Sequence, residues 1–310
     1  MKKRIAALLV LILMGLCACE KNKPEDTQKT EPTQSTTIAE ETEDATPEEP
    51  LPTGLPEYFS TIQYAITPDW FYLMDATTNQ DGDTWLRCDL RRVNLLDGTE
   101  EKPMPLPDYN GEELNSVVIC GVTDEYLYFA ERHYDDEQKE SAVIFRVPHE
   151  TMQAELVTVF SSFDFAEIKL SPSGKQLLYP VLKRENPNDD ESRITKLCVE
   201  GYDLNSGERH VVYDALGIFH WLGVPEQTMD GRLAFHANKD NEAYCVVFDE
   251  NDHVQTQRWE NSGIELLHHF LGRDGFSIPL SRRWRLVCDA EIWEGRFLAL
   301  IDRYTDYVMR

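Results

Sequence analysis

Four polar segments of this sequence carry the side chains best suited to chemistry, which are aspartate, glutamate and asparagine. The segments are "ATTNQDGDT", "RHYDDEQKES", "RENPNDDESR" and "NKDNEA". Carboxylate and amide oxygens suit hard cations, and loops held by a rigid scaffold often bind ligands. The candidate ligand-binding residues are Asn79, Asp81, Asp83, Asp135, Asp136, Asp189 and Asp190. The simpler interpretation, that these are solvated loops of an acidic protein, is the one we favour.

The segment "TNQDGD" has oxygen-bearing residues at alternate positions followed by glycine, as calcium-binding loops do. The EF-hand pattern, however, requires an aspartate where Thr77 stands and a glutamate where Cys88 stands. The match fails at both ends. We therefore expect no cofactor and no metal site, and Ca²⁺ at this loop is the one alternative kept open.

No catalytic constellation is recognisable in the sequence. The G-x-S-x-G elbow that carries the nucleophile of α/β-fold serine peptidases is absent. No HExxH or comparable metal-ligand spacing occurs at the histidines, including His220, His236, His268 and His269. We therefore predict a protein without enzymatic activity and assign no catalytic residue.

The cysteines after the N-terminal segment are odd in number, widely spaced and set in apolar runs. They are Cys88, Cys120, Cys198, Cys245 and Cys288. A disulfide framework favours an even number of cysteines, and no CxxC spacing suggests a metal site. We predict buried free thiols, with a single Cys88–Cys120 or Cys245–Cys288 bridge as the alternatives.

Short β-type runs and polar turns alternate from Phe59 to the C-terminus, in a repeating order. One set of hairpins turns at Asp97-Gly98, His149-Glu150, Asn205-Ser206-Gly207 and Glu250-Asn251. Each is preceded by another hairpin, in "TIQYAITPDWFYLM", "SVVICGVTDEYLYF", "AEIKLSPSGKQLLY" and "FHWLGVPEQTMDGRLAF". A fifth, degraded copy joins "FSIPLSRRWRLVC" to "GRFLALIDRYTDYVMR".

Two hairpins in each repeat make a four-stranded antiparallel unit, and a repeat of about 50 residues is typical of a β-propeller. Strands covered on both faces explain the continuous apolar runs "VVICGV" and "KQLLY". We predict an all-β protein in which residues 57–310 form one β-propeller of four-stranded antiparallel blades. Five blades are favoured, and six are the alternative.

The element "LSPSGKQLLY", with "TPDWFYL", "TDEYLYF" and "MDGRLAF" at matching places, resembles the SPDGK-like repeat of TolB-type propellers. The same elements look like the propeller domains of uncharacterised bacterial, often clostridial, surface lipoproteins. The resemblance implies a fold and a location. It says almost nothing about activity, because function depends on sites and not on folds.

Glycosidases built on five-bladed propellers need a pair of acidic residues on the innermost strands. Here those strands are predicted in "STIQYAI", "SVVICGV", "AEIKL", "IFHWLGV" and "FSIPL". Glu167 is the one acidic residue among them. One carboxylate cannot supply the pair, so we expect no glycosidase activity.

The chain begins with Met1-Lys2-Lys3-Arg4 and an apolar run from Ile5 to Leu16, which is too short for a spanning helix. The following "LCAC" resembles the lipobox of bacterial lipoproteins, with Cys19 as the residue that carries the lipid. A secretory signal cleaved after Ala18 is the alternative. We predict a lipoprotein signal peptide at residues 1–18 and a protein anchored by its lipid to the extracytoplasmic face of the bacterial cell membrane.

Residues 19–56 are rich in Thr, Glu and Pro and almost free of apolar side chains, which predicts a disordered tether. The formal net charge of −26 disfavours nucleic acid and anionic lipid surfaces as partners. Cationic ligands remain open. We expect a monomer that reaches the membrane through its lipid anchor and binds a protein or a cell-wall polymer.

The leading hypothesis is therefore a membrane-anchored lipoprotein whose propeller is a non-catalytic binding or scaffolding module. The alternative from another class is a metal-dependent, glycan-binding or hydrolytic propeller that uses the acidic loops. A purely structural envelope protein is the third hypothesis.

Overall fold

The computed structural model describes residues 55–78, 85–107, 109, 117–134, 140–161, 168–186, 189, 191–267, 277–279, 284–289, 297–302 and 308–309. The chain divides into two units, Met1–Thr46 and Pro47–Arg310, and every described residue belongs to the second unit. The predicted signal peptide at 1–18, the lipidation site Cys19 and nearly all of the predicted tether lie outside the described residues.

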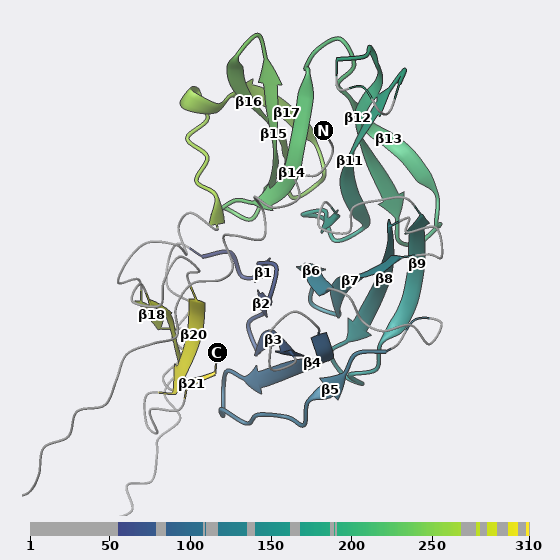
Figure 1. Cartoon of the computed structure of the whole chain (residues 1–310). Helices are drawn as coiled ribbons and strands as arrows, with labels where there is room; N and C mark the ends of the chain where they lie inside the picture. The colour runs from purple at the N-terminus through teal and green to yellow at the C-terminus, as the bar shows by residue number, and fades with distance from the viewer. Residues whose placement is uncertain are drawn as a thin grey trace, which may run out of the picture. The chain divides into compact units, whose positions relative to one another are not determined.

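Antiparallel strands make up most of the regular structure (Figure 1). The first sheet contains β1 (Phe59–Ser60), β2 (Tyr64–Ile66), β3 (Trp70–Thr78), β4 (Trp85–Asn94) and β5 (Met104–Pro105). The second contains β6 (Val117–Val122), β7 (Tyr126–Tyr134), β8 (Glu140–Pro148) and β9 (Glu155–Ser161). The third contains β10 (Lys169–Leu170), β11 (Gln176–Arg184), β12 (Ile194–Asp203) and β13 (Arg209–Asp214).

The fourth sheet contains β14 (Trp221–Gln227), β15 (Leu233–Lys239), β16 (Glu242–Phe248) and β17 (Val254–Arg258), and is followed by the short 3₁₀ helix η2 (Trp259–Asn261). The last sheet contains β18 (Ser277–Pro279), β19 (Trp284–Asp289), β20 (Phe297–Asp302) and β21 (Val308–Met309). In every sheet the strands neighbour one another in chain order. The prediction of an all-β propeller built from antiparallel blades is confirmed.

The predicted turns lie where the sequence placed them. Asp97-Gly98, His149-Glu150, Asn205-Ser206-Gly207 and Glu250-Asn251 each connect the last two strands of their sheet. The predicted innermost runs contain β6, β10 and the first part of β14. In the first sheet "STIQYAI" does not form one strand, because Thr61 Oγ1 accepts a hydrogen bond from the Tyr64 amide at 3.1 Å. This turn separates β1 from β2 and gives that sheet five strands.

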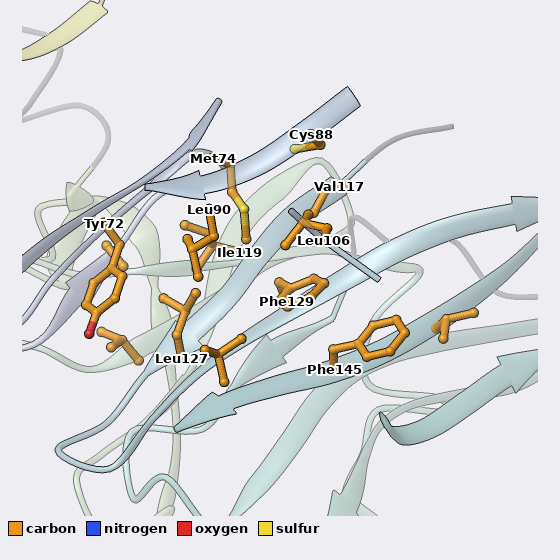
Figure 2. Close-up of a cluster of buried hydrophobic side chains, with 14 residues drawn as sticks. Tyr72, Met74, Cys88, Leu90, Leu106, Val117, Ile119, Leu127, Phe129 and Phe145 are labelled. Atoms are coloured by element: carbon orange, nitrogen blue, oxygen red, sulfur yellow. The ribbon is translucent and has the colours of Figure 1, made fainter. Parts of the chain in front are cut away.

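Apolar clusters between successive sheets hold the first four blades together. Tyr72 and Met74 of β3 pack in one cluster with Phe129 and Phe145 of the second sheet (Figure 2). A second cluster joins the second and third sheets and includes Phe160 and Tyr179, whose rings meet edge to face at 5.1 Å. A third cluster joins the third and fourth sheets around Phe235 and Phe248. Side chains alternate between the two faces of a strand, so each blade can contribute to two such interfaces.

Buried cysteines confirm the prediction of free thiols for the side chains that the structure describes. Cys88, Cys120, Cys198 and Cys245 are all buried and unbridged. The alternative bridges Cys88–Cys120 and Cys245–Cys288 are therefore wrong, since each needs a cysteine that is free here. Burial raises the pKa of Cys88 and of Cys120 to about 12, so both remain neutral thiols at physiological pH.

Candidate functional site

Asp189 is the one candidate acidic residue that falls within the described part of the chain. It is exposed, and its Oδ1 accepts a hydrogen bond from the Glu191 amide at 3.0 Å. Its backbone carbonyl accepts one from the Ser192 hydroxyl at 2.7 Å. These contacts stabilise its own turn. Asn79, Asp81, Asp83, Asp135, Asp136, Asp190 and Glu167 lie outside the described residues.

Among the described residues, no group of three or more histidine, cysteine, aspartate or glutamate side chains could hold a metal ion. The same part of the chain contains no helix long and apolar enough to cross a membrane.

The turns within the hairpins gather polar side chains at one end of the blades. Neighbouring strands are antiparallel, so in the second, third and fourth sheets the turns that join the first and second strands lie at the same end as the turns that join the third and fourth. In the five-stranded first sheet the corresponding turns are those between β2 and β3 and between β4 and β5. Thr123 Oγ1 accepts a hydrogen bond from the Tyr126 amide at 3.0 Å, and Thr67 Oγ1 makes the same contact with the Trp70 amide. We call this end the hairpin-turn end.

At the hairpin-turn end, the carboxylate of Asp252 in the fourth blade is bound by the turn between β10 and β11 of the third blade. Asp252 Oδ2 accepts hydrogen bonds from the hydroxyls of Ser171 at 3.0 Å and Ser173 at 2.5 Å. It also accepts one from Gln176 Nε2 at 2.9 Å, and the Ser173 amide donates to Oδ1 at 3.2 Å. Asp252 has φ of 63°, in the left-handed region that aspartate tolerates better than most residues. The "SPSG" turn thus connects the third blade to the fourth through its hydrogen bonds to Asp252.

A second contact between blades centres on His149. Its Nε2 lies 2.9 Å from the Thr123 carbonyl oxygen, which can only accept, so Nε2 carries the proton. Nδ1 then accepts the hydroxyl proton of Tyr72 at 2.6 Å. Arg92 donates to the His149 carbonyl and lies 3.9 Å from the centre of the Trp70 ring. Burial lowers the pKa of His149, and the neighbouring Arg92 guanidinium also lowers it, against opposite effects of Thr123 and Asp124.

A groove of about 590 Å³ opens at the hairpin-turn end between the second and third blades. Tyr58 and Tyr126 supply its aromatic surface, and Tyr128 lines it with a side chain that is otherwise buried. Its polar lining consists of Thr123, Asp124, Glu125, Arg146, Ser171, Ser173, Lys175 and Asn205. Arg146 is held in place, because its guanidinium lies 4.9 Å from the centre of the Tyr126 ring and its Nε donates to Glu155 at 2.8 Å. Aromatic surface with a few fixed polar groups is typical of ligand sites.

A smaller cavity of about 100 Å³ lies among the innermost strands of the blades. It is lined by Tyr58, Phe59, Ser60, Cys120, Gly121, Val122, Lys169, Leu170, Ser171, Pro172, Gln227, Gly231, Arg232 and Leu233. Tyr58, Val122, Ser171 and Pro172 also line the groove, so the two spaces meet at these residues. Burial lowers the pKa of Lys169, while electrostatic interaction with Glu226 raises it. Two cationic side chains, Lys169 and Arg232, line this cavity. Arg232 forms an ion pair with Asp230, whereas Lys169 forms none with the residues that the structure describes.

Sequence reasoning missed both the groove and Lys169. The signal for Lys169 was present, since "AEIKL" was predicted as an innermost strand and a lysine there must point along the axis or into a neighbour. The groove gave no local signal, because its walls come from turns that are nearly 50 residues apart in the chain, such as Thr123 and Ser171.

No known protein-family model matches the chain. No curated protein matches it either. Solved structures that match the chain come from a study of two prolyl endopeptidases (15% identity, TM-score 0.37), an ACO/RPE65 chimera (8%, 0.30) and the acylaminoacyl peptidase of Pyrococcus horikoshii (11%, 0.31). The matches cover 82%, 80% and 83% of this chain but 35%, 58% and 45% of those chains. The chain thus spans less than two thirds of the length of each, and the likeness carries no functional inference.

Proposed function

We propose that this protein is a membrane-anchored, extracytoplasmic lipoprotein whose propeller binds a polypeptide partner without catalysis. The observation that carries the proposal is the tyrosine-lined groove between the second and third blades. The phenol rings of Tyr58 and Tyr126 provide apolar surface with little conformational entropy to lose, and charged side chains of both signs line the same space. A polypeptide offers partners to both kinds of surface.

Charge favours a basic segment of the partner. The chain carries a formal net charge of −26, whereas the groove itself carries both signs, with Asp124 and Glu125 beside Arg146 and Lys175. Such a field raises the encounter rate with cations and opposes anionic polymers. A basic side chain can also contact the ring of Tyr58.

The anchor is proposed from the first nineteen residues. A basic start, a short apolar run and the "LCAC" sequence support lipidation of Cys19, and the acidic segment after it would hold the propeller away from the headgroups. Mass spectrometry of the N-terminal peptide of protein from the membrane fraction tests this. We expect a peptide that begins at Cys19 and carries acyl chains. An unmodified Cys19 would overturn the anchor and leave the groove untouched.

We also propose that β18–β21 is a fifth blade that closes the ring against the first. Phe71 and Leu73 of β3 point to the face opposite Tyr72 and Met74, and both are buried. They do not belong to the cluster shared with the second blade. A sheet that covers them on that face would explain their burial, and the C-terminal sheet is the one that remains in the chain.

Site-specific photocrosslinking on intact cells tests the groove. A photoreactive phenylalanine derivative at Asn205, an exposed groove residue, should give a protease-sensitive adduct. The same derivative at Val211, which is half exposed on the outer strand β13, is the matched control. We expect the adduct at position 205 alone, and its loss in Tyr126→Ala. Equal adducts at both positions, or a protease-resistant adduct, would contradict a polypeptide in the groove.

A further inference from the structure

Lys169 supplies a cation to the small cavity among the innermost strands. Its Nζ donates a hydrogen bond to the Ile119 carbonyl at 2.8 Å, which fixes the side chain between β10 and β6. An ammonium group has three N–H donors. The described residues give this one a single hydrogen-bond partner, so two donors remain to be satisfied by whatever occupies the cavity.

The charged and amide side chains that line the cavity beside Lys169, and the Ser171 hydroxyl, are already engaged. The Gln227 side chain accepts from the Ser60 amide at 3.0 Å and donates to the Tyr58 carbonyl at 2.9 Å. Ser171 donates to Asp252, and Arg232 is paired with Asp230 at 2.7 Å. Cys120, beside Lys169, is a neutral thiol and brings no charge. The chemistry of the cavity is therefore that of one ammonium group.

Size and charge limit what this ammonium group can bind. A cavity of about 100 Å³ has room for several water molecules, and so for a carboxylate with a small substituent. The Glu226 carboxylate interacts electrostatically with Lys169 and balances part of its charge. The net charge of the whole protein opposes polyanions. One carboxylate fits these limits, and a polyanion does not.

We propose that the cavity is a carboxylate-binding site in which the Lys169 ammonium group donates two hydrogen bonds to a single carboxylate. The carboxylate comes either from a free small acid or from the C-terminus of a peptide. The second source rests on the proposed function, since a peptide in the groove can reach the cavity past Tyr58 and Pro172, where the two spaces meet. Capture of a chain-terminal carboxylate is a known mode of peptide recognition.

The probe for the site itself is sodium acetate, compared with sodium chloride at equal ionic strength. Full-length protein in detergent micelles, labelled with ¹³C and ¹⁵N at the lysine side chains, reports the Lys169 signal by NMR. We expect acetate, and not chloride, to shift this signal saturably and to raise the pKa of Lys169, because a bound anion stabilises the ammonium form. Absence of a saturable shift would overturn the carboxylate site.

Matched variants assign the effect to one amine. Lys169→Met removes the ammonium group with little change in volume, whereas Lys183→Met removes an exposed lysine of β11. Acetate should stabilise the wild-type protein and Lys183→Met against heat, and should bind Lys169→Met at least about tenfold more weakly. If Lys169→Met does not fold, the pKa of Lys169 in the wild-type protein with and without acetate still decides. An equal response of Lys169→Met and Lys183→Met would overturn the proposal.

Two peptides separate the sources of the carboxylate. N-acetyl-trialanine and its C-terminal amide differ only in the terminal charge. A shift of the Lys169 signal with the free acid and not with the amide supports the chain terminus as the ligand. If acetate shifts the Lys169 signal and neither peptide does, the ligand is a free small acid, and the C-terminus of a peptide is excluded as the source of the carboxylate. Photocrosslinking at Asn205 reads the groove separately, so failure at Lys169 does not count against the proposed function.

Discussion

Asp252 shows how a single side chain can join two repeats of this chain. It accepts from Ser171, Ser173 and Gln176, of which Ser171 is 81 residues away in the sequence. Ser171 and Gln176 are buried, so loss of their acceptor would leave buried donors unsatisfied. Hydrogen bonds to a charged acceptor contribute more to stability than neutral ones.

We expect Asp252→Asn to lower the free energy of unfolding by about 2 to 3 kcal/mol. Asparagine keeps the shape of the side chain and tolerates the left-handed backbone, so the change removes mainly the charge and part of the accepting capacity. Urea unfolding followed by tryptophan fluorescence measures the loss. Glu250→Ala, at an exposed position of the same turn, is the control and should stay within about 0.5 kcal/mol of the wild-type protein. Equal stability of the two variants would show that the contact contributes nothing.

His149 should make stability depend on pH between the first and second blades. Its pKa is lowered in the folded protein, while in the unfolded chain it titrates near its ordinary value of about 6.5. Above that pH both states are neutral and the contribution is fully present. As the pH falls below it, the unfolded chain takes up the proton first, so the free energy of unfolding decreases. The surrounding groups are Tyr72, Thr123, Arg92 and Asp124.

Urea unfolding at pH 7.5 and at pH 5.0 tests this effect. The wild-type protein should lose more stability on acidification than His149→Gln, which cannot be protonated. His210→Gln, at an exposed position of β13, should behave like the wild-type protein. The same pH dependence in wild type and His149→Gln would assign the effect to other groups.

The innermost strands β6 and β10 approach each other closely at Gly121. A Cβ atom at Gly121 would overlap with the Cβ atom of Leu170. We expect Gly121→Ala to destabilise the protein by about 2 to 4 kcal/mol, because the overlap is with a strand and not with a flexible side-chain end. Gly217→Ala is the comparison. Gly217 has φ of 75°, but a Cβ atom there would meet no other atom within 4 Å, so the substitution should lower the free energy of unfolding by only about 1 kcal/mol. Denaturant unfolding of both variants measures the difference, and equal losses would contradict the close approach.

Hairpins were the part of this protein that the sequence specified best. Turn residues such as Asn205-Ser206-Gly207 act locally, so their position in the sequence is enough to place them. Contacts between blades were not predictable in the same way, because Asp252 and Ser171 are joined only by the packing of two sheets. Lys169 was hidden for a different reason. Lysine in a strand is ordinarily an exposed residue, and burial beside Ile119 becomes visible only when the innermost strands are assembled.

At the scale of the whole molecule, ring closure by β18–β21 is open to a direct test. In the full-length protein Phe71→Ser should lower the free energy of unfolding by about 3 to 5 kcal/mol, since Phe71 is fully buried. In a chain of residues 1–276 the same substitution should have little effect, because the covering sheet is absent. The truncated chain should also bind a dye specific for exposed apolar surface. Equal effects of Phe71→Ser in both chains would exclude the C-terminal sheet as the cover of this face.

The hydrogen bonds of Gln227 should affect how the protein resists a mechanical force. Its side chain joins β14 of the fourth blade to the backbone of Tyr58 and Ser60, which lie at the start of the described chain. A force applied ahead of Leu55 would therefore enter the propeller at two points, the hydrogen bonds of β1 with β2 and the Gln227 amide. Shearing two attachments in parallel requires more force than peeling one strand from a sheet edge. A propeller pulled by its N-terminus would resist extension at its first strand, where an open sheet would begin to unravel.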